Sequence, residues 1–308
     1  MPPAVVALVS CCALLSTAVA AQSPTDGKAT NHDALFYRAF FIDRELEQPA
    51  AALALYQQYL EAAPRDRFAG QAAHGAIKIL RDEERTEEAR ALRQQHAAVL
   101  AETTPLGIND SFLDPAAEAG KFVARFESES REVFTHRQEL LDLLDLAEGQ
   151  RVADIGAGTG FFAKLFARAV GTTGKVFAVD ISPKLVEHLR GLAKQMELPQ
   201  LEVVHCSERS TGLPEAAIDV AFICDTYHHF SHPAETMTSL HRAMRPGGQL
   251  FLVEFERIEG KSREWILDHV RAGQEVFRAE IEAAGFRCVG VEDAPFLSDN
   301  YVLRFERE

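Results

Sequence analysis

The residues of this chain that are best suited to bind a ligand form a glycine-rich turn near its middle. Gly156, Gly158 and Gly160 follow an apolar run that contains Asp154. Glycine permits positive φ angles and lets a ligand approach the backbone without meeting a Cβ atom. The segment 161–170 is predicted to be a helix, and the free N–H groups at a helix start attract electron-rich ligand atoms. The pattern predicts a nucleotide-type cofactor at this turn, although a turn without a ligand could carry the same glycines.

A second carboxylate lies where such a cofactor would need it. The next predicted strand, 175–180, ends in Asp180. This residue follows the turn by about 20 residues, the distance at which a βαβ unit brings an acid to the ribose hydroxyls. The dinucleotide fingerprint requires a small residue at its sixth position so that helix and strand pack closely, but Phe161 stands there. This position disfavours NAD.

Polar side chains also follow the predicted strand 218–224. Tyr227, His228 and His229 are the candidate catalytic residues, and Asp225 precedes them. Open α/β sheets bind their ligands at the carboxyl ends of such central strands. One imidazole, with a pKa of about 6.5, could act as a general base, the imidazoles and Asp225 could bind a metal, or the residues could shape the loop. Adjacent histidines lack the i, i+4 spacing of helical metal sites and no third ligand is close in the sequence, so no metal ligands are predicted.

Four motifs, in this order, resemble those of class I S-adenosylmethionine (SAM) dependent methyltransferases. Residues 154–160 resemble motif I, and residues 178–182 resemble the acidic loop that follows it. Residues 219–225 are similar to the fourth strand with its motif IV acid, and residues 240–250 to the Pro-Gly-Gly turn that enters the fifth strand. The resemblance covers about residues 151–307, roughly half of the chain.

The resemblance implies SAM as the cofactor. Asp154 and the backbone of Gly156 and Gly158 would hold its methionine end, and Asp180 would bind its ribose. The complete set of predicted cofactor residues is Asp154, Gly156, Gly158, Gly160, Asp180, Ile181, Ser207, Glu208 and Asp225.

The adenine end is predicted on weaker sequence similarity. Ile181 would pack on the adenine, and Ser207 or Glu208 would approach its amino group, where the family commonly has a Gly-Asp pair. Methyl transfer from a sulfonium is an in-line displacement with an activated leaving group, so the protein mainly supplies proximity, orientation and desolvation. Glu254, Trp265 and His269 could line the pocket of the methyl acceptor.

The second half of the chain alternates predicted strands and helices, as a doubly wound α/β sheet demands. Only 293–300 separates the last two predicted strands, which is too short for a helical crossover, so they must pair antiparallel. The resemblance implies a seven-stranded sheet in the order 3-2-1-4-5-7-6, with strand 7 antiparallel, over residues 117–308.

A small all-α region precedes this domain. Residues 33–100 contain two predicted helical hairpins, and 101–116 is predicted to be a linker with proline and glycine breakers. The second helices of the hairpins share a small-large alternation that resembles tetratricopeptide repeats. A surface for a protein or peptide partner is one interpretation, and a helical appendage is the favoured one because repeat arrays usually need three or more units.

The start of the chain resembles a secretory leader. Residues 1–20 are predicted to be a signal peptide that ends in Ala18-Val19-Ala20, and the polar segment 21–32 is predicted to be a linker. The apolar run is short for a permanent membrane anchor. Against export stands the lack of Lys or Arg before the run. We expect an exported, periplasmic protein, with a cytoplasmic location as the alternative.

The composition limits the partners. A net charge of −14 repels nucleic acid phosphates and anionic lipids, so neither is an expected partner. The cysteines beyond the leader are Cys206, Cys224 and Cys288. The expected strand order places the first two about 14 Å apart, whereas a disulfide requires Cα atoms within about 7 Å. Free thiols are therefore expected.

The prediction from the sequence is a SAM-dependent methyltransferase that acts on a small-molecule acceptor. A catalytically silent SAM-fold binding module is the main alternative, and a NAD-dependent oxidoreductase is the other.

Overall fold

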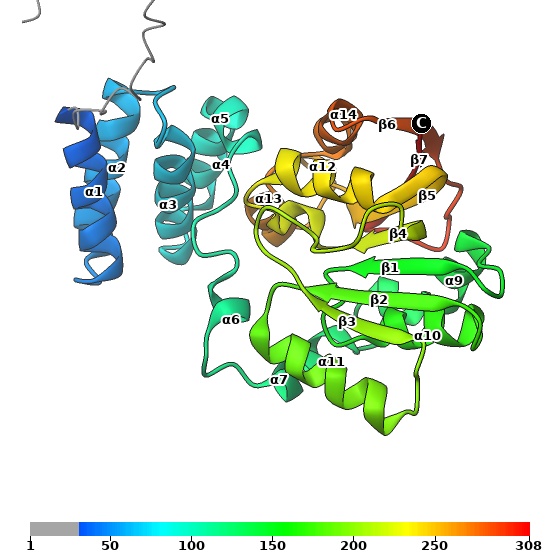
Figure 1. Cartoon of the computed structure of the whole chain (residues 1–308). Helices are drawn as coiled ribbons and strands as arrows, with labels where there is room; N and C mark the ends of the chain where they lie inside the picture. The colour runs from blue at the N-terminus through cyan, green and yellow to red at the C-terminus, as the bar shows by residue number, and fades with distance from the viewer. Residues whose placement is uncertain (1–30) are drawn as a thin grey trace, which may run out of the picture.

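The computed structural model describes residues 31–308 (Figure 1). The predicted leader, 1–20, and nearly all of the predicted linker, 21–32, lie outside the described residues. The chain forms a helical part, blue to cyan in Figure 1, and an α/β part, green to red, which pack side by side. No helix within 31–308 is long and apolar enough to cross a membrane.

Successive helices of the N-terminal part pack on one another. They are α1 (Asn31–Arg44), α2 (Pro49–Ala62), α3 (Ala69–Asp82), α4 (Thr86–Gln95) and α5 (Ala97–Ala101). Small residues let α3 approach its neighbours: Ala72, Ala73 and Ala76 are fully buried, and a Cβ on Gly75 would lie 2.8 Å from the ring of Tyr56. The all-α region predicted before the sheet is confirmed, and its predicted bounds, 33–100, stay a prediction. Its likeness to tetratricopeptide repeats stays a prediction.

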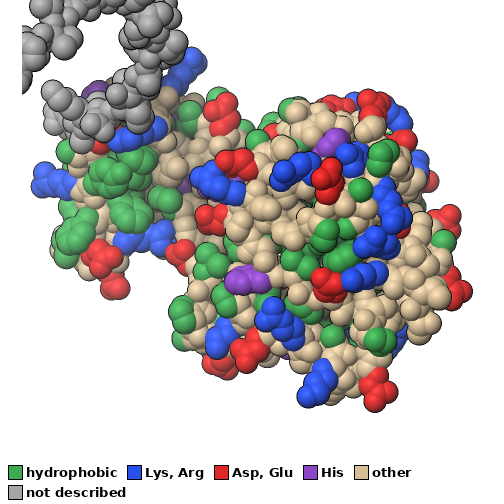
Figure 2. All heavy atoms as spheres, in the orientation of Figure 1, with side chains coloured by type: hydrophobic (Ala, Val, Ile, Leu, Met, Phe, Trp, Pro, Cys, Tyr) green, Lys and Arg blue, Asp and Glu red, His purple; other side chains and the backbone are tan. Residues whose placement is uncertain are grey.

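The outer surface of the first helix carries apolar side chains. Tyr37 and Phe41 of α1 are more than half exposed, and Figure 2 shows hydrophobic side chains gathered on this part of the molecule. They fit the predicted partner surface, which the structure leaves untested.

Short helices lead from the helical part into the sheet. They are α6 (Asp110–Leu113), α7 (Ala119–Phe126), α8 (Glu132–Thr135) and α9 (Arg137–Leu144). The segment predicted to be a linker, 101–116, is attached to the α/β part: Thr104 Oγ1 donates a hydrogen bond to the carbonyl of Phe230 (3.0 Å), and Arg271 donates one to the carbonyl of Ala101 (2.7 Å). The linker therefore has a fixed position.

Seven strands form one sheet in the order β3-β2-β1-β4-β5-β7-β6. They are β1 (Arg151–Ile155), β2 (Lys175–Asp180), β3 (Leu201–His205), β4 (Ile218–Cys224), β5 (Met244–Phe255), β6 (Phe286–Val291) and β7 (Asn300–Arg307). Strand β7 runs antiparallel to both of its neighbours, and the other pairs are parallel. The predicted fold class, strand order and antiparallel β7 are confirmed.

Helices cover both faces of the sheet. They are α10 (Phe161–Ala169), α11 (Pro183–Gln195), α12 (Pro233–Ala243), α13 (Glu264–His269) and α14 (Gln274–Ala283). Side chains of α12, α13 and α14 share one buried cluster with the strands, and those of α9 and α10 share the other. Strands β1 and β4 are nearly fully buried on both faces, as parallel sheets require.

The strand order places a ligand site in the middle of the sheet. From β1 the chain winds outward through β2 and β3, and then returns to β4 on the other side of β1. Such a switch point opens a crevice at the carboxyl ends of the strands, where doubly wound sheets bind ligands. Cys206, Cys224 and Cys288 are free thiols, as expected.

Candidate active site

A cavity of about 670 Å³ lies at the carboxyl ends of β1, β2 and β4. Its walls come from the glycine turn after β1, the loops after β2, β3 and β4, and helices α7, α8 and α13. Gly107 to Asn109 of the linker and Phe112 of α6 complete the wall. The helical part of the protein thus contributes to the cavity through the linker that leaves it.

The glycine turn divides into two residues that face the cavity and one that does not. Gly156 and Gly158 line the cavity with positive φ angles (75° and 56°). A Cβ on Gly156 would collide with Thr226, whereas a Cβ on Gly158 would meet nothing closer than 3.7 Å. Gly160 was predicted to bind the cofactor, but it lies behind the turn. A Cβ there would lie 2.6 Å from Leu189 of α11, so this glycine is needed for helix packing.

Asp154 is a buried carboxylate with an oxygen that lacks a partner. The residue is 3% exposed, and its Oδ2 atom accepts no hydrogen bond from any described residue. Burial, aided by the charge of Asp180, raises the pKa of Asp154 to about 7. A buried carboxylate oxygen without a partner is costly, and a cationic ligand group next to it would remove that cost.

Asp180 is held in place by backbone donors. Its carboxylate accepts hydrogen bonds from the N–H groups of Gly158 and Ser182, both at 2.8 Å. Burial raises the pKa of Asp180 to about 6, although these N–H groups act in the opposite direction. The carboxylate lines the cavity at the end of β2, where the sequence predicts the ribose contact.

The predicted adenine residues lie on the β3 side of the cavity. Ile181, Ser207 and Glu208 all line it. Ser207 and Ser210 form a tight turn, with a backbone hydrogen bond of 3.0 Å from the N–H of Ser207, and the carbonyl of Glu208 accepts a bond of 3.0 Å from Thr236. The structure thus brings these three predicted residues to one wall.

Asp225 lines the cavity, but its carboxylate is already occupied. It accepts hydrogen bonds of 2.6 Å from Arg131 and of 2.6 Å from Asn300 of β7. Burial raises its pKa, and the neighbouring guanidinium of Arg131 opposes that shift. This carboxylate therefore ties the segment before α8 to the sheet, a role that differs from the predicted cofactor contact.

Tyr227 does not reach the cavity. Its ring packs on Phe277 in the core, and its hydroxyl donates a hydrogen bond of 3.0 Å to Glu280. Arg271 holds the same carboxylate at 2.6 Å. The prediction of a catalytic Tyr227 disagrees with this position, because the hydroxyl faces away from the ligand site.

His228 is buried and bound to a carboxylate. Its Nδ1 lies 2.7 Å from Oε1 of Glu254, and its backbone N–H donates to the same oxygen at 3.2 Å. Burial alone would raise the pKa of Glu254, but His228 and the backbone N–H groups lower it overall. An ionised Glu254 accepts the Nδ1 proton, which leaves Nε2 as the free nitrogen of His228.

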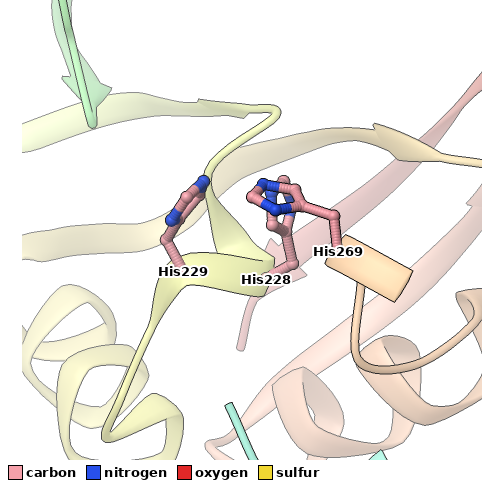
Figure 3. A group of neighbouring side chains, drawn as sticks. All are labelled: His228, His229 and His269. Atoms are coloured by element: carbon pink, nitrogen blue, oxygen red, sulfur yellow. The ribbon is translucent and has the colours of Figure 1, made fainter. Parts of the chain in front are cut away.

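His229 is tied to the linker in a similar way. Its Nδ1 lies 3.0 Å from Oδ1 of Asn109, whose amide nitrogen donates to the carbonyl of His229 at 3.0 Å. The third imidazole, that of His269, comes from the last residue of α13. Figure 3 shows the three rings on one side of the short 3-10 turn η1 (Tyr227–His229).

The residues that sequence reasoning missed come from distant segments. Asn109 and Asn300 hold His229 and Asp225, and neither stands in a motif. His269 was predicted to line the acceptor pocket, but its clustering with His228 and His229 was not, because only the packing of α13 beside η1 brings the three together.

The comparisons with known proteins agree with this geometry. Residues 153–252 match a family model described as a methyltransferase domain. A SAM-dependent methyltransferase from Aquifex aeolicus superposes with a TM-score of 0.54 at 24% identity, over 61% of this chain and 97% of that one. A Haloferax volcanii methyltransferase, solved with the Trm112 methyltransferase activator, superposes with a TM-score of 0.51 at 17% identity, over 65% and 96%. Residues 153–252 are thus similar to methyltransferase domains, and the α/β part has the fold of SAM-dependent methyltransferases.

Curated relatives match a shorter stretch. The ubiquinone/menaquinone biosynthesis C-methyltransferase UbiE of Pseudomonas putida (strain GB-1) is 30% identical over 122 residues, which is 39% of this chain and 48% of that protein. An uncharacterized 37.1 kDa protein in transposon Tn4556 of Streptomyces fradiae is 31% identical over 120 residues, or 39% and 34%. The chain spans between a third and a half of the length of these relatives.

The residues of the cavity fit SAM. The cofactor carries an ammonium group and a sulfonium at its methionine end, and the unpaired oxygen of Asp154 offers a partner for a cation. The open space at Gly158 admits a ligand against the backbone. Asp180 provides a fixed acceptor for ribose hydroxyls.

Proposed function

We propose that this protein transfers the methyl group of SAM to a small-molecule acceptor. The observation that carries the proposal is that one cavity offers room for both the cofactor and the acceptor. It runs from Asp154 and Asp180 on the cofactor side to a wall of aromatic and imidazole rings on the other. A shared cavity is what an in-line transfer between two bound molecules requires.

The acceptor end has the composition of a small-molecule site. Aromatic rings from four segments line it: Phe112 of α6, Phe230 after η1, Phe255 of β5 and Trp265 of α13. Imidazoles and other polar side chains stand among them, and aromatic walls with directed polar groups are typical of small-ligand pockets. The net charge of −14 also disfavours polyanionic acceptors.

The residues of this chain position the reactants and exclude water. Asp154 and Asp180 would orient the cofactor, and the linker with Phe112 would cover the acceptor. Since the sulfonium is already activated, the reaction does not require a general base. If a base does take part, Nε2 of His228 is the candidate, because Glu254 orients this imidazole through its Nδ1.

A methyl-transfer screen tests the proposal. The chain from residue 21 to 308 is incubated with methyl-labelled SAM and pools of small metabolites, and labelled products are separated from SAM. We expect transfer to at least one acceptor, and no transfer by Asp154→Asn. If the protein binds SAM but transfers its methyl group to no acceptor, it is instead a silent SAM-binding module.

We also propose export across a membrane, with support from the leader pattern at 1–20. Cell fractionation and N-terminal sequencing of the protein from its own cells test this. We expect a mature chain that starts at Ala21, and a full-length cytosolic chain would refute export.

A further inference from the structure

The acceptor end of the cavity contains a cluster of three imidazoles. His228 and His229 come from η1, and His269 comes from the end of α13 (Figure 3). One ring nitrogen of each lies within 4.8 Å of the others. Within residues 31–308, no other group of three His, Cys, Asp or Glu side chains meets this spacing. All three imidazoles line the cavity.

Two of the imidazoles are oriented by oxygen atoms behind them. Glu254 accepts from Nδ1 of His228, and Oδ1 of Asn109 faces Nδ1 of His229 because the amide nitrogen is engaged with a carbonyl. Both Nδ1 atoms are therefore engaged, and the Nε2 atoms are the ring nitrogens left to face a ligand. Metal-binding histidines almost always have such a partner on the second ring nitrogen, which fixes the tautomer and raises the basicity of the ligand.

A buried negative charge lies next to the cluster. Glu254 is fully buried and its Oε1 lies 2.7 Å from Nδ1 of His228. The side chain of Arg125, which also lines the cavity, is exposed.

We propose that His228, His229 and His269 form a binding site for one divalent transition-metal ion of the Zn²⁺ class, with an open coordination position toward the cavity. Three nitrogens at about 2.0–2.1 Å from such an ion lie about 3.3 Å apart. Since the His269 imidazole has no hydrogen bond to any described residue, a rotation of its side chain can close the remaining distance. Three histidines and one open position are the ligand set of catalytic zinc sites.

An ion at this position would accept an oxygen of the methyl acceptor as its fourth ligand. This consequence rests on the proposed methyl transfer, whereas the binding of the ion does not. The three imidazoles therefore determine which kind of metal ion binds. The bound ion in turn favours methyl acceptors that carry an anionic or ionisable oxygen.

The test is a Co²⁺ titration of the metal-free chain from residue 21 to 308, followed by competition with Zn²⁺. We expect one Co²⁺ per chain, with the visible absorption of a four-coordinate ion, and its displacement by Zn²⁺. His269→Ala should weaken Co²⁺ binding at least about 100-fold. Removing a metal ligand costs more affinity than removing a residue that only hydrogen-bonds to a ligand. His188→Ala, a histidine of α11 outside the cavity, is the matched control and should bind as the unaltered protein does.

A second variant keeps the test valid if His269→Ala does not fold. Asn109→Ala removes only the partner of His229 and should weaken Zn²⁺ binding by about 10- to 100-fold. The affinity for S-adenosylhomocysteine is measured on every sample. Two outcomes overturn the metal site and leave the proposed function standing. In the first, the protein binds S-adenosylhomocysteine but shows no saturable Co²⁺ or Zn²⁺ binding. In the second, it binds metal, but neither variant weakens that binding. Metal binding without S-adenosylhomocysteine binding supports the site and counts against the proposed function.

Discussion

Asp154 is the residue whose ionisation should respond most to the cofactor. In the free protein its pKa is raised to about 7 by burial and by Asp180. A raised carboxyl pKa stabilises the fold below the unfolded pKa of about 4, and this contribution is lost as the pH rises through the folded value. A cation bound next to Asp154 reverses the shift, because it favours the charged form.

We therefore expect the unfolding free energy of the free protein to fall between pH 4 and 7 relative to that of Asp154→Asn. Urea titrations of both proteins across this range measure the difference. SAM binding below pH 7 should also release protons, which calorimetry in two buffers of different ionisation enthalpy detects. A stability difference that is flat with pH would show that Asp154 is already ionised in the free protein.

Tyr227 was predicted to be catalytic from its place after β4, but its packing in the core keeps it away from the cavity. Tyr227→Phe should lower stability by about 1 kcal/mol, because one buried hydrogen bond to Glu280 is lost while Arg271 still pairs with that carboxylate. The affinity for S-adenosylhomocysteine should stay unchanged. Denaturation and calorimetry check both, and a loss of affinity without a loss of stability would return Tyr227 to the site.

The sequence predicts residues well where a motif also defines the backbone. Asp154, Gly156, Gly158 and Asp180 line the cavity because strand, turn and helix follow one another locally. Gly160 belongs to the same motif, yet its contact is with α11, and no local rule separates a glycine that faces a ligand from one that faces a helix. The partner of Asp225 could not be predicted either, since Asn300 lies in β7 and reaches it only through the antiparallel strand.

At the scale of elements, α13 connects the helical part to the cavity. Arg93 of α4 is 2% exposed and bonds to Glu264 and Asp268 of α13 at 2.8 and 2.6 Å, and to Glu259 at 3.2 Å. Helix α13 also carries Trp265, which lines the acceptor wall. Helix α4 thus fixes the element on which the acceptor end depends.

Arg93→Ala should lower the unfolding free energy by about 3 kcal/mol, because it leaves the buried carboxylate of Asp268 without its closest partner. Arg90→Ala on the same helix is the control: its pair with Glu87 is exposed, so a change within about 0.5 kcal/mol is expected. Equal losses in the two variants, measured by urea denaturation, would mean that the contact between α4 and α13 adds no stability.

The alternation of strands and helices predicted every strand of the sheet, because parallel sheets impose both the crossover lengths and the apolar runs. The role of the linker was not predictable from its composition. Proline and glycine breakers indicate irregular backbone, but they do not reveal that Asn109 bonds to His229 across the cavity.

At the scale of the whole molecule, the two parts share one site. The cofactor residues all lie in the α/β part, and the linker supplies part of the acceptor wall. The fragment 115–308 should therefore bind S-adenosylhomocysteine within about tenfold of the full chain, a difference of about 1.4 kcal/mol. It should lose methyl transfer to any acceptor found in the screen. Full transfer by the fragment would reduce the helical part to an appendage.

The central claim is that the cavity at the carboxyl ends of β1, β2 and β4 binds SAM through the carboxylates of Asp154 and Asp180. Calorimetric titration of the chain from residue 21 to 308 with S-adenosylhomocysteine tests it most directly, with Asp180→Ala beside the exposed control Asp293→Ala. We predict one site per chain, a loss of about 1 to 3 kcal/mol for Asp180→Ala, no loss for the control, and no binding of NAD. An Asp180→Ala protein that binds as tightly as the unaltered one, or a chain that binds NAD in place of S-adenosylhomocysteine, would contradict the account.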